Sequence, residues 1–339
     1  MYIRKKGRRM KLLTVASLMA TALAASRTRA PSGCLVVRKE GGSDFYSTVQ
    51  SAVDALSTSD TAAQCIFIQP GTYTEQVLVT SRKAPLSIYG HTEDDTSYGS
   101  NTVTLVHSAS QASTGGSNDE TATLRVKAPN FRLYNVNVEN SYGKGSQAVA
   151  VSAYADSGYY GCSMKGFQDT LLSNDGKQVY ARSLIQGATD FVFGQRARAW
   201  FETCDIKVVE NSVGYITANG RDSESNVSFY VFNSSSIAAA SGHNVANGAY
   251  YLGRPWRDHA RVVFQHTSMS SVINSAGWRE WGSSDPKTCC VLFGEYGNTG
   301  PGASGQRASF STKLSTPIQI AEILGDGFET AGFFDAAYL

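Results

Sequence analysis

Glutamine and aspartate recur at one interval within an apolar stretch in the middle of the chain. Gln147 and Gln168 are separated by the same interval as Asp169 and Asp190. The residues around them, in "SQAVAVSA", "GFQDTLL" and "DFVFG", are mostly apolar or aromatic. A fixed interval of this length predicts that equivalent side chains occupy the same place in successive structural units, so that Gln147 stacks on Gln168 and Asp169 on Asp190.

Two stacked aspartates could work as an acid and base pair. If the units stack as neighbouring strands, their carboxyl groups lie roughly 4.8 Å apart. Carboxylates this close repel each other, so one of them is expected to have a raised pKa and to hold a proton at mildly acidic pH. The other is then free as a nucleophile or base. Two glutamines add neutral N–H donors for a developing negative charge, which suits acyl transfer at an ester carbonyl.

Other hydrolytic machinery is missing from the sequence. There is no Gly-x-Ser-x-Gly motif for a nucleophilic serine. The histidines, at positions 91, 107, 243, 259 and 266, are scattered without the spacing of metal ligands, and the cysteines lack the spacing of a zinc site. We therefore expect no metal and no cofactor.

The segments that must position these residues have the pattern of short strands. Beyond residue 86 the apolar residues come in short pieces, such as "LSIYG", whose alternation fits strands better than helices. Three pieces resemble one another around Tyr160, Tyr180 and Phe201, which follow at nearly equal intervals. A period near 20 with several strands per unit predicts an all-β fold, a parallel β-helix with about three short strands per turn.

Short helices are expected at both ends of the stack, where they would cap exposed strand edges. Residues 43–57 place four apolar side chains on one helical face: Phe45, Val49, Val53 and Leu56. Ser43 or Asp44 is the expected cap of this helix. Toward the C-terminus, "STPIQIAEILGDG" predicts a helix with Thr316 as the cap, Pro317 as the first residue and Gly325 as the stop.

Residues 1–25 have the composition of a secretory signal peptide, which leaves residues 26–339 as a single catalytic β-helix domain. A basic segment, "RKKGRRMK", precedes the apolar run "LLTVASLMATALA", which is too short to span a bilayer. Without the six basic residues of this leader, 24 Lys and Arg face 28 Asp and Glu, a net charge of about −4 instead of +2. We expect a secreted, extracellular protein that binds neither nucleic acid nor membrane, and the sequons at Asn226 and Asn233 are consistent with export.

The cysteines also fit an exported protein, in which disulfides can form. Cys34 and Cys65, both in strand-like runs near the N-terminal end, are the favoured pair. We expect Cys162 and Cys204 to be buried thiols.

Five motifs follow one another along the chain: "GTYTEQV", "QAVAVSA", "GFQDTLL", "DFVFG" and "YLGRPW". In this order they resemble the signature motifs of pectin methylesterases, carbohydrate esterase family 8, and most of all the secreted fungal members. The resemblance covers roughly residues 35–335. It implies a right-handed parallel β-helix that needs no metal. It also implies hydrolysis of the C6 methyl ester of galacturonate in pectin, with release of methanol.

The resemblance also implies roles for single residues. Asp190 resembles the nucleophile and Asp169 the general acid and base. Gln147 and Gln168 correspond to the donors that stabilise the oxyanion. Arg254, in "YLGRPW", resembles the residue that hydrogen-bonds the nucleophile, and we expect Gln147 and Arg254 to contact the substrate as well.

Aromatic residues are the candidates for contacts with sugar rings. Trp256 resembles a subsite aromatic on which a ring stacks. Phe191 follows the nucleophile and, from its position alone, is expected to shape the pocket for the methyl group. Tyr215 and Tyr251 are further candidates on the same ground. The implied partner is methylated homogalacturonan, bound by a monomer.

Three alternatives share this type of fold, which does not determine activity. A glycosidase would use two carboxylates but would not require the paired glutamines. A calcium-dependent lyase would need a denser acidic cluster. A catalytically inactive carbohydrate-binding protein would lack at least one of Asp169, Asp190 and Arg254, and all three are present.

Overall fold

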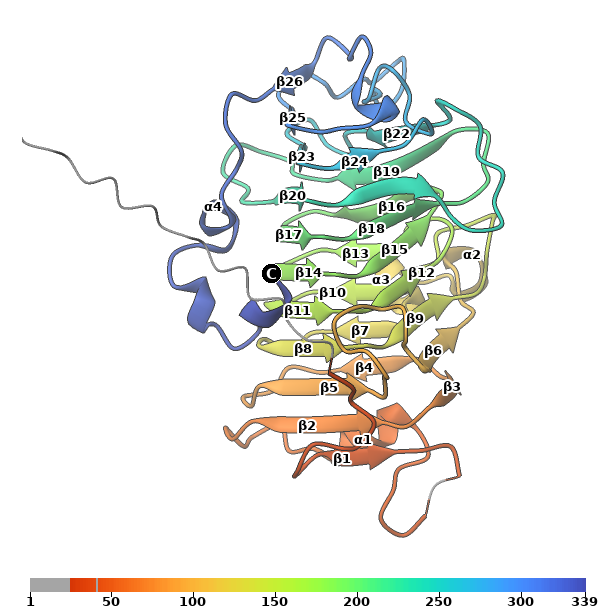
Figure 1. Cartoon of the computed structure of the whole chain (residues 1–339), viewed down its shortest axis with the longest axis vertical. Coiled ribbons are helices and arrows are strands. Elements are labelled where there is room, and N and C mark those ends of the chain that lie inside the picture. Colours follow the sequence, from red (N-terminus) through yellow and green to blue (C-terminus); the bar gives the residue numbers. More distant parts are fainter. Residues whose placement is uncertain (1–24, 41) are drawn as a thin grey trace, which may run out of the picture.

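The computed structural model describes residues 25–40 and 42–339, which form a parallel β-helix of stacked coils (Figure 1). The predicted fold class is thereby confirmed, whereas most of the predicted leader, residues 1–24, lies outside the described residues. Within the described part of the chain, three parallel sheets contain 11, 8 and 7 strands.

Each sheet takes one strand from every coil that reaches it. The 11-stranded sheet contains, in spatial order, β1 (Leu35–Val37), β2 (Gln64–Ile68), β5 (Leu86–Gly90), β8 (Phe131–Tyr134), β11 (Ser157–Tyr160), β14 (Lys177–Ala181), β17 (Arg198–Glu202), β20 (Phe229–Asn233), β23 (Arg261–Gln265), β25 (Leu292–Tyr296) and β26 (Ser311–Lys313). The 8-stranded sheet contains β3 (Gly71–Thr74), β6 (Val103–His107), β9 (Asn137–Asn140), β12 (Ser163–Lys165), β15 (Leu184–Gly187), β18 (Asp205–Val208), β21 (Ser236–Ala239) and β24 (Ser268–Met269). The 7-stranded sheet contains β4 (Val77–Val79), β7 (Leu124–Val126), β10 (Val151–Ala153), β13 (Leu171–Ser173), β16 (Thr189–Gly194), β19 (Gly214–Asn219) and β22 (Tyr250–Gly253).

Helices are few and short. The α-helices are α1 (Val49–Ala55), α2 (Gln111–Thr114), α3 (Asn118–Thr121) and α4 (Ile320–Leu324). The 3-10 helices are η1 (Pro301–Ala303), η2 (Phe328–Thr330) and η3 (Ala336–Tyr338). None of the helices among the described residues is long and apolar enough to cross a bilayer.

Along the chain, a coil contributes one strand to the 11-stranded sheet, then one to the 8-stranded sheet and one to the 7-stranded sheet. One coil contains β14, β15 and β16 in this order, and the next contains β17, β18 and β19. Val179 of β14 pairs with Trp200 of β17, so these neighbouring coils stack at the interval that separates Asp169 from Asp190. A residue with positive φ stands at the corner between the first two strands of successive coils: Asn135, Gly161, Arg182, Thr203, Ser234 and His266. This repeated left-handed residue makes the same sharp bend in each coil.

The interior of the coils is filled by apolar side chains from all three sheets. Aromatic rings form a ladder along the stack, with ring centroids of neighbours 4.2–4.8 Å apart: Tyr159, Tyr180, Phe201, Phe232 and Phe264. The predicted alignment of Tyr160 with Tyr180 is wrong by one residue, because Tyr159 pairs with Tyr180. Tyr160 faces the other side of its strand and stacks on Tyr134 outside the coil.

The N-terminal helix α1 begins later than predicted. Its cap is Thr48, whose side chain accepts a hydrogen bond from the backbone N–H of Ser51. The caps expected at positions 43 and 44 are therefore wrong. Tyr46 pairs with β1 in a β-bridge, which keeps the chain extended up to this point. The carboxylate of Glu75 then accepts the first two free N–H groups of the helix. Val49 and Val53 are buried as predicted.

The C-terminal helix α4 also begins late, and it does not cap the end of the stack. The side chain of Gln265 binds both backbone groups of Ile318, at 2.9 and 3.0 Å, and so holds the expected first turn extended. Gly325 ends the helix as predicted. Ile323 and Leu324 pack against the outer face of the 11-stranded sheet, along its side (Figure 1).

The cysteine predictions are confirmed. Cys34, the residue before β1, forms a disulfide with Cys65 of β2, and Cys162 and Cys204 are buried free thiols. Of the two sequons, the one at Asn226 is poorly placed for a glycan. Its side chain is buried and its amide donates to a carbonyl oxygen and to a carboxylate, at 3.0 and 2.8 Å, so a sugar attached to Nδ2 would remove at least one of these bonds.

Replacing Phe201 by Ala should lower the free energy of unfolding by about 3–5 kcal/mol, the usual cost of removing a buried aromatic ring. Phe201 is fully buried between the rings of Tyr180 and Phe232. Denaturant unfolding measures the loss. Phe310→Ala, near the C-terminal end where the ring is only partly buried, is the control and should lose less. An equal loss in both variants would contradict a special contribution of the ladder.

Candidate active site

Asp169 and Asp190 lie side by side on neighbouring coils, as their spacing in the sequence predicted. Asp169 precedes β13, Asp190 lies in β16, and these strands pair in parallel. Gln168 bridges to Thr189, and the N–H of Asp169 donates to the carbonyl oxygen of Thr189 at 3.0 Å. Both acids have positive φ, 64° and 50°. Two strained residues in adjacent coils are typical of a functional site, and Asp tolerates this conformation better than most residues.

The carboxylate of Asp190 is bound by the guanidinium of Arg254. Nε donates to Oδ1 at 3.0 Å and a terminal nitrogen donates to Oδ2 at 2.6 Å, so the pair is bidentate. The guanidinium carbon lies 4.1 Å from the ring centre of Tyr215 and 4.3 Å from that of Trp281. Two aromatic rings therefore hold the arginine in the plane that suits a bidentate contact.

Asp169 has quite different surroundings. Within the described part of the chain, its carboxyl group receives one hydrogen bond, from Nδ2 of Asn118 to Oδ2 at 3.2 Å, and no ion pair. Both acids are 7% exposed, so neither is well hydrated. Asp190, by contrast, shares its two oxygens with the positive charge of Arg254.

These surroundings separate the pKa values of the two acids. Burial raises the pKa of Asp169 well above its usual value, and the charge of Asp190 raises it further, while Asn118 and Arg254 act against the rise. Burial also raises the pKa of Asp190, but the hydrogen bonds and charge of Arg254 oppose it. Asp190 is therefore the acid that ionises first, and Asp169 is the one that keeps its proton.

The two glutamines lie next to the acids. The N–H of Ala148 donates to the carbonyl oxygen of Gln168 at 3.1 Å, which brings the segment of Gln147 alongside that of Gln168. Oε1 of Gln147 accepts a hydrogen bond from Ser146 at 3.4 Å, which leaves its NH₂ group free to donate. The side chain of Gln168 is partly exposed and has no hydrogen-bond partner among residues 25–40 and 42–339. Both amides can thus donate to a bound ligand.

The aromatic residues predicted to contact sugar rings lie in different surroundings. Trp256 is partly exposed and packs against Phe193, with ring centres 6.2 Å apart. Gly220 makes room for it, because a Cβ there would lie 2.7 Å from the indole ring. Tyr215 stacks between Arg254 and Tyr251, whose ring centre is 5.8 Å away, so these two tyrosines support the arginine.

The expectation that Phe191 shapes the methyl pocket is wrong. Its side chain is fully buried in the main core inside the coil. The register of β16 shifts between Thr189 and Val192, and side chains on a strand alternate between its two faces. Asp190 therefore faces outward, Phe191 inward, and Phe193, which reaches Trp256, faces outward again.

Sequence reasoning missed Asn118 and Trp281. Asn118 lies in "SNDE", a capping-box pattern that predicts a helix start but says nothing about Asp169. Trp281 follows "AGWRE" with no periodic signal at all. Asn118 reaches Asp169 from α3, and Trp281 reaches Arg254. Both residues lie outside the repeating strands, where spacing carries no information.

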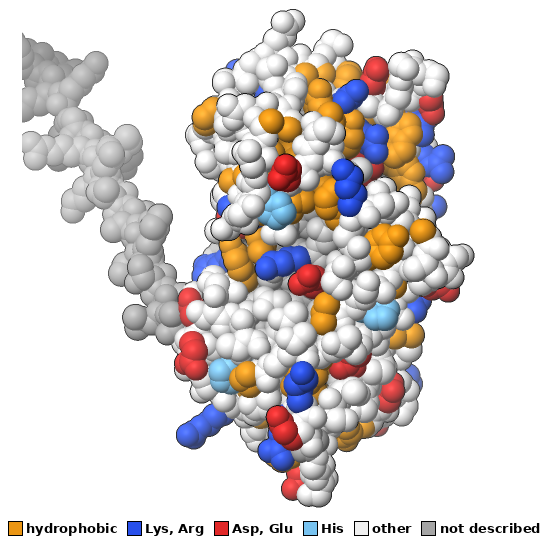
Figure 2. Space-filling model, turned by 90° about the vertical axis from the view of Figure 1, so that its right-hand side faces the viewer, with side chains coloured by type: hydrophobic (Ala, Val, Ile, Leu, Met, Phe, Trp, Pro, Cys, Tyr) orange, Lys and Arg blue, Asp and Glu red, His pale blue; other side chains and the backbone are white. Residues whose placement is uncertain are grey.

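The side of the molecule that carries α2 is hollowed. Figure 2 looks onto this side and shows basic, acidic and hydrophobic side chains around a hollow at mid-height. Among the described residues, no group of three or more His, Cys, Asp and Glu is placed to hold a metal ion.

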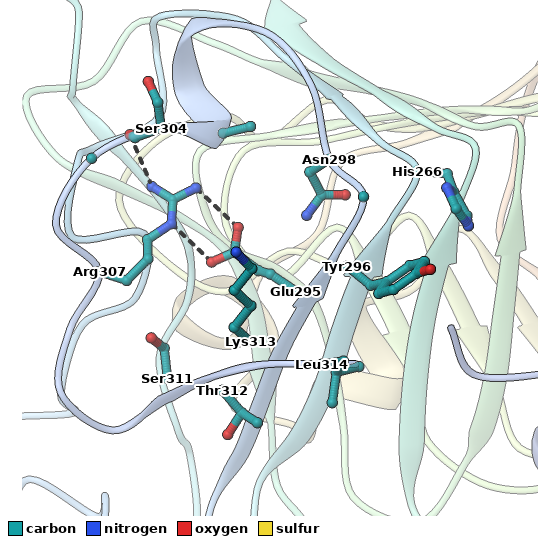
Figure 3. A pocket seen from close by; sticks show the side chains of 13 residues that line it. His266, Glu295, Tyr296, Asn298, Ser304, Arg307, Ser311, Thr312, Lys313 and Leu314 are labelled. Carbon is teal, nitrogen blue, oxygen red and sulfur yellow. Dashed lines mark hydrogen bonds and ion pairs between the residues drawn. The ribbon is translucent and has the colours of Figure 1, made fainter. Parts of the chain in front are cut away.

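A separate cavity of about 810 Å³ lies toward the C-terminal end and is lined by none of the predicted site residues. Arg307 crosses it to reach both carboxylate oxygens of Glu295, at 2.9 Å each (Figure 3). Glu295 also accepts a hydrogen bond from Trp278. The charges of Glu295 and Arg307 are therefore paired with each other.

Comparison with known proteins identifies the family. A family model described as Pectinesterase matches residues 35–320. The chain belongs to the pectinesterase family. The pectinesterase of Aspergillus aculeatus is 52% identical to it over 330 residues, which covers 96% of this chain and 98% of that protein. The pectinesterase of Aspergillus niger is 53% identical over 323 residues, covering 94% and 96%.

Solved pectin methylesterase structures share the fold. The enzyme from Aspergillus niger in deglycosylated form has a TM-score of 0.84 at 40% identity and covers 92% of this chain and 100% of that one. The enzyme from carrot has a TM-score of 0.76 at 28% identity, covering 85% and 90%. The predicted resemblance is thus confirmed, and the protein is an enzyme, a pectinesterase with pectin methylesterase activity.

Replacing Asp169 by Asn should stabilise this pectinesterase at neutral pH. The folded protein binds the proton of Asp169 more tightly than the unfolded chain does, because its folded pKa is raised. The resulting stabilisation is complete below the unfolded pKa of about 3.9 and is lost as the pH rises through the folded pKa. Asn is neutral throughout and avoids this loss, and it tolerates the same left-handed backbone.

We therefore expect Asp169→Asn to unfold at a higher temperature than wild type at about pH 8, by roughly 2–4 °C for each kcal/mol gained. The difference should shrink as the pH falls through the folded pKa and vanish below the unfolded pKa of about 3.9, where the wild-type carboxyl group is protonated in both states. Thermal unfolding followed by circular dichroism measures both. The same pH dependence in the two proteins would show that Asp169 does not carry a raised pKa.

Proposed function

We propose that this pectinesterase hydrolyses the C6 methyl ester of galacturonate units, with Asp190 as the nucleophile and Asp169 as the general acid and base. The observation that carries the proposal is the unequal environment of two neighbouring buried carboxyl groups. Asp190 is bound at both oxygens by Arg254, whereas Asp169 receives only the neutral amide of Asn118 among the described residues. Over the pH range in which the pair holds one proton, a charged nucleophile stands beside a protonated acid.

The first half of the reaction releases methanol. A carboxylate oxygen of Asp190 attacks the ester carbonyl carbon, and the carbonyl oxygen becomes an oxyanion. The free amides of Gln147 and Gln168 donate to this oxyanion without altering the charge of the acid pair. The bond to the methoxy group then breaks as Asp169 gives its proton to the departing oxygen. The products of this half are methanol and an anhydride between Asp190 and the galacturonate C6.

The second half regenerates the enzyme. Asp169 is now a carboxylate and takes a proton from water, and the resulting hydroxide attacks the C6 carbonyl of the anhydride. The same two amides stabilise the second oxyanion. The bond to Asp190 breaks, Asp190 leaves as a carboxylate that Arg254 stabilises, and the freed galacturonic acid loses its proton to solvent.

The proposed substrate and partner is methylated homogalacturonan. The curated relatives named above are pectinesterases, and a pectin methylesterase solved in complex with a hexasaccharide shares the fold, with a TM-score of 0.72 at 22% identity. The partly exposed ring of Trp256, next to the acids' outward face, offers a surface for a sugar ring. We also propose that the protein is exported, acts extracellularly as a monomer and needs no cofactor.

Methanol release from methylated pectin, measured beside the length of the polymer, tests the reaction. We expect methanol with unchanged chain length, whereas shorter chains would indicate a glycosidase or lyase instead. Asp190→Ala should abolish methanol release, because it removes the carboxylate that Arg254 holds. Its thermal unfolding checks that the fold remains. A folded Asp190→Ala enzyme with near-wild-type turnover would refute the assigned nucleophile.

Replacing Gln168 by Leu should lower kcat by about 10²–10³, the usual cost of losing one oxyanion donor. KM should change little, because the donor acts on charge that develops only in the transition state. Steady-state kinetics on methylated pectin measure both. Gln186→Leu is the control, since Gln186 is a partly exposed glutamine in the 8-stranded sheet. A Gln168→Leu enzyme with an unchanged kcat would remove this glutamine from the oxyanion site.

A further inference from the structure

We propose that Asn118 is a positioning residue for Asp169, and that its amide determines which oxygen of that carboxyl group carries the proton. This inference rests on the proposed function, in which Asp169 is the acid. It adds a residue that lies outside the five motifs and 51 positions before the acid it serves. The residue acts only through Asp169 and is not assigned a contact with the substrate.

The hydrogen bond from Asn118 has a definite direction. Nδ2 is an obligatory donor, so Oδ2 of Asp169 accepts, at 3.2 Å. Oδ1 of Asp169 has no partner within the described part of the chain. A proton on Oδ2 would compete with the N–H of Asn118 for the same side of that oxygen. The proton of Asp169 is therefore favoured on Oδ1, the oxygen left free to give it to a leaving group.

The helix that carries Asn118 is tied to the sheet of the acids. Asp119, the next residue, is 7% exposed and binds Arg125 at 2.6 Å, Lys127 at 2.9 Å and the hydroxyl of Ser152 at 2.7 Å. Arg125 lies in β7 and Ser152 in β10, two strands of the 7-stranded sheet that also contains β13 and β16. A buried carboxylate with three partners is a strong anchor for so short a helix.

The other end of the same turn is anchored beside the glutamines. The hydroxyl of Thr121 donates to the carbonyl oxygen of Asn118 at 2.8 Å and accepts from the N–H of Val149 at 3.1 Å. The side chain of Asn140 donates to the carbonyl oxygens of Thr121 and Val149, at 3.0 and 2.9 Å. Val149 closely follows Gln147 in the chain. Asn118 is thus held in a rigid frame that already includes part of the site.

The orientation of the Asn118 side-chain amide leaves one of its polar atoms without a hydrogen bond, which costs free energy. Oδ1 is buried and finds no hydrogen-bond partner among the described residues. Leaving a buried acceptor unpaired is unfavourable, and such groups in folded proteins call for an explanation. Turning the amide around would put this oxygen against the carboxyl group of Asp169 and lose the N–H donor. The observed orientation is the one in which the amide donates to Asp169.

The same bond also adjusts the acidity of Asp169. The groups that act on it are Asp190 from β16, Arg254 from the segment after β22, and Asn118 from α3. Burial and the charge of Asp190 raise the pKa of Asp169, whereas the amide of Asn118 favours the ionised form and holds the rise back. An acid whose pKa is too high is a poor proton donor. By limiting the rise in the pKa of Asp169, Asn118 therefore favours proton transfer to the departing methanol.

Asn118→Leu tests the inference, because Leu has a similar shape and no donor. We expect the alkaline limb of the pH profile of kcat/KM, which reports loss of the proton of Asp169, to move to higher pH by about one unit. We also expect kcat at the optimum to fall about tenfold, a part of the ~10²–10⁴-fold that a positioned acid contributes. Asn118→Asp, which places a third carboxyl group there, should move the limb in the same direction and provides a second variant if Leu prevents folding.

Glu120→Gln is the matched control, since Glu120 is an exposed residue of the same helix that contacts Ser117 and not the acids. Its pH profile should match that of wild type. A merely structural role of Asn118 would lower the unfolding temperature or kcat and leave the alkaline limb in place, and an unmoved limb in both Asn118 variants would overturn the inference. Wild-type protein without methanol release, or a fully active Asp169→Asn, would instead refute the proposed function itself.

Discussion

The pairing of successive parallel coils places two carboxyl groups so close together that ionising both of them is unfavourable. Neighbouring strands in such a stack are roughly 4.8 Å apart, and Asp169 and Asp190 occupy equivalent positions one coil apart. Both are buried, so water does little to screen them. The other residues of the site stabilise this pair of acids, and they do so by giving each acid different binding partners.

The difference between the acids comes from segments that the stack itself does not position. Arg254 follows β22, two coils beyond Asp190, and reaches back to bind it, while Tyr215 and Trp281 hold the guanidinium between their rings. Asn118 reaches Asp169 from α3, which precedes β7 in the chain. A cation on one acid and a neutral amide on the other are sufficient to separate their protonation states. The coil therefore brings the acids together, and its loops give them different roles.

Particular residues show which parts of the fold and the site the sequence patterns predicted correctly. The repeated interval predicted the coil and the neighbourhood of the two acids, because in a stacked solenoid the period alone decides which residues lie above one another. The same reasoning misaligned Tyr160 by one position, since it fixes the period and not the phase of a strand. Both terminal helices were predicted to start too early. Their first turns are held extended by partners outside the helix, β1 for Tyr46 and the distant Gln265 for Ile318.

By itself the sequence determined the family, the stacked strands, the acid pair and the adjoining glutamines, because each depends on spacing or on motifs that are local in the chain. Only the tertiary structure decided that Phe191 faces inward, that Asn118 holds Asp169, and that Trp281 covers Arg254. The physical reason is the same in each case. Which face a side chain takes at an irregular strand, and which loop closes over a groove, depend on packing between segments that are distant in sequence, and a one-dimensional period carries no record of that packing.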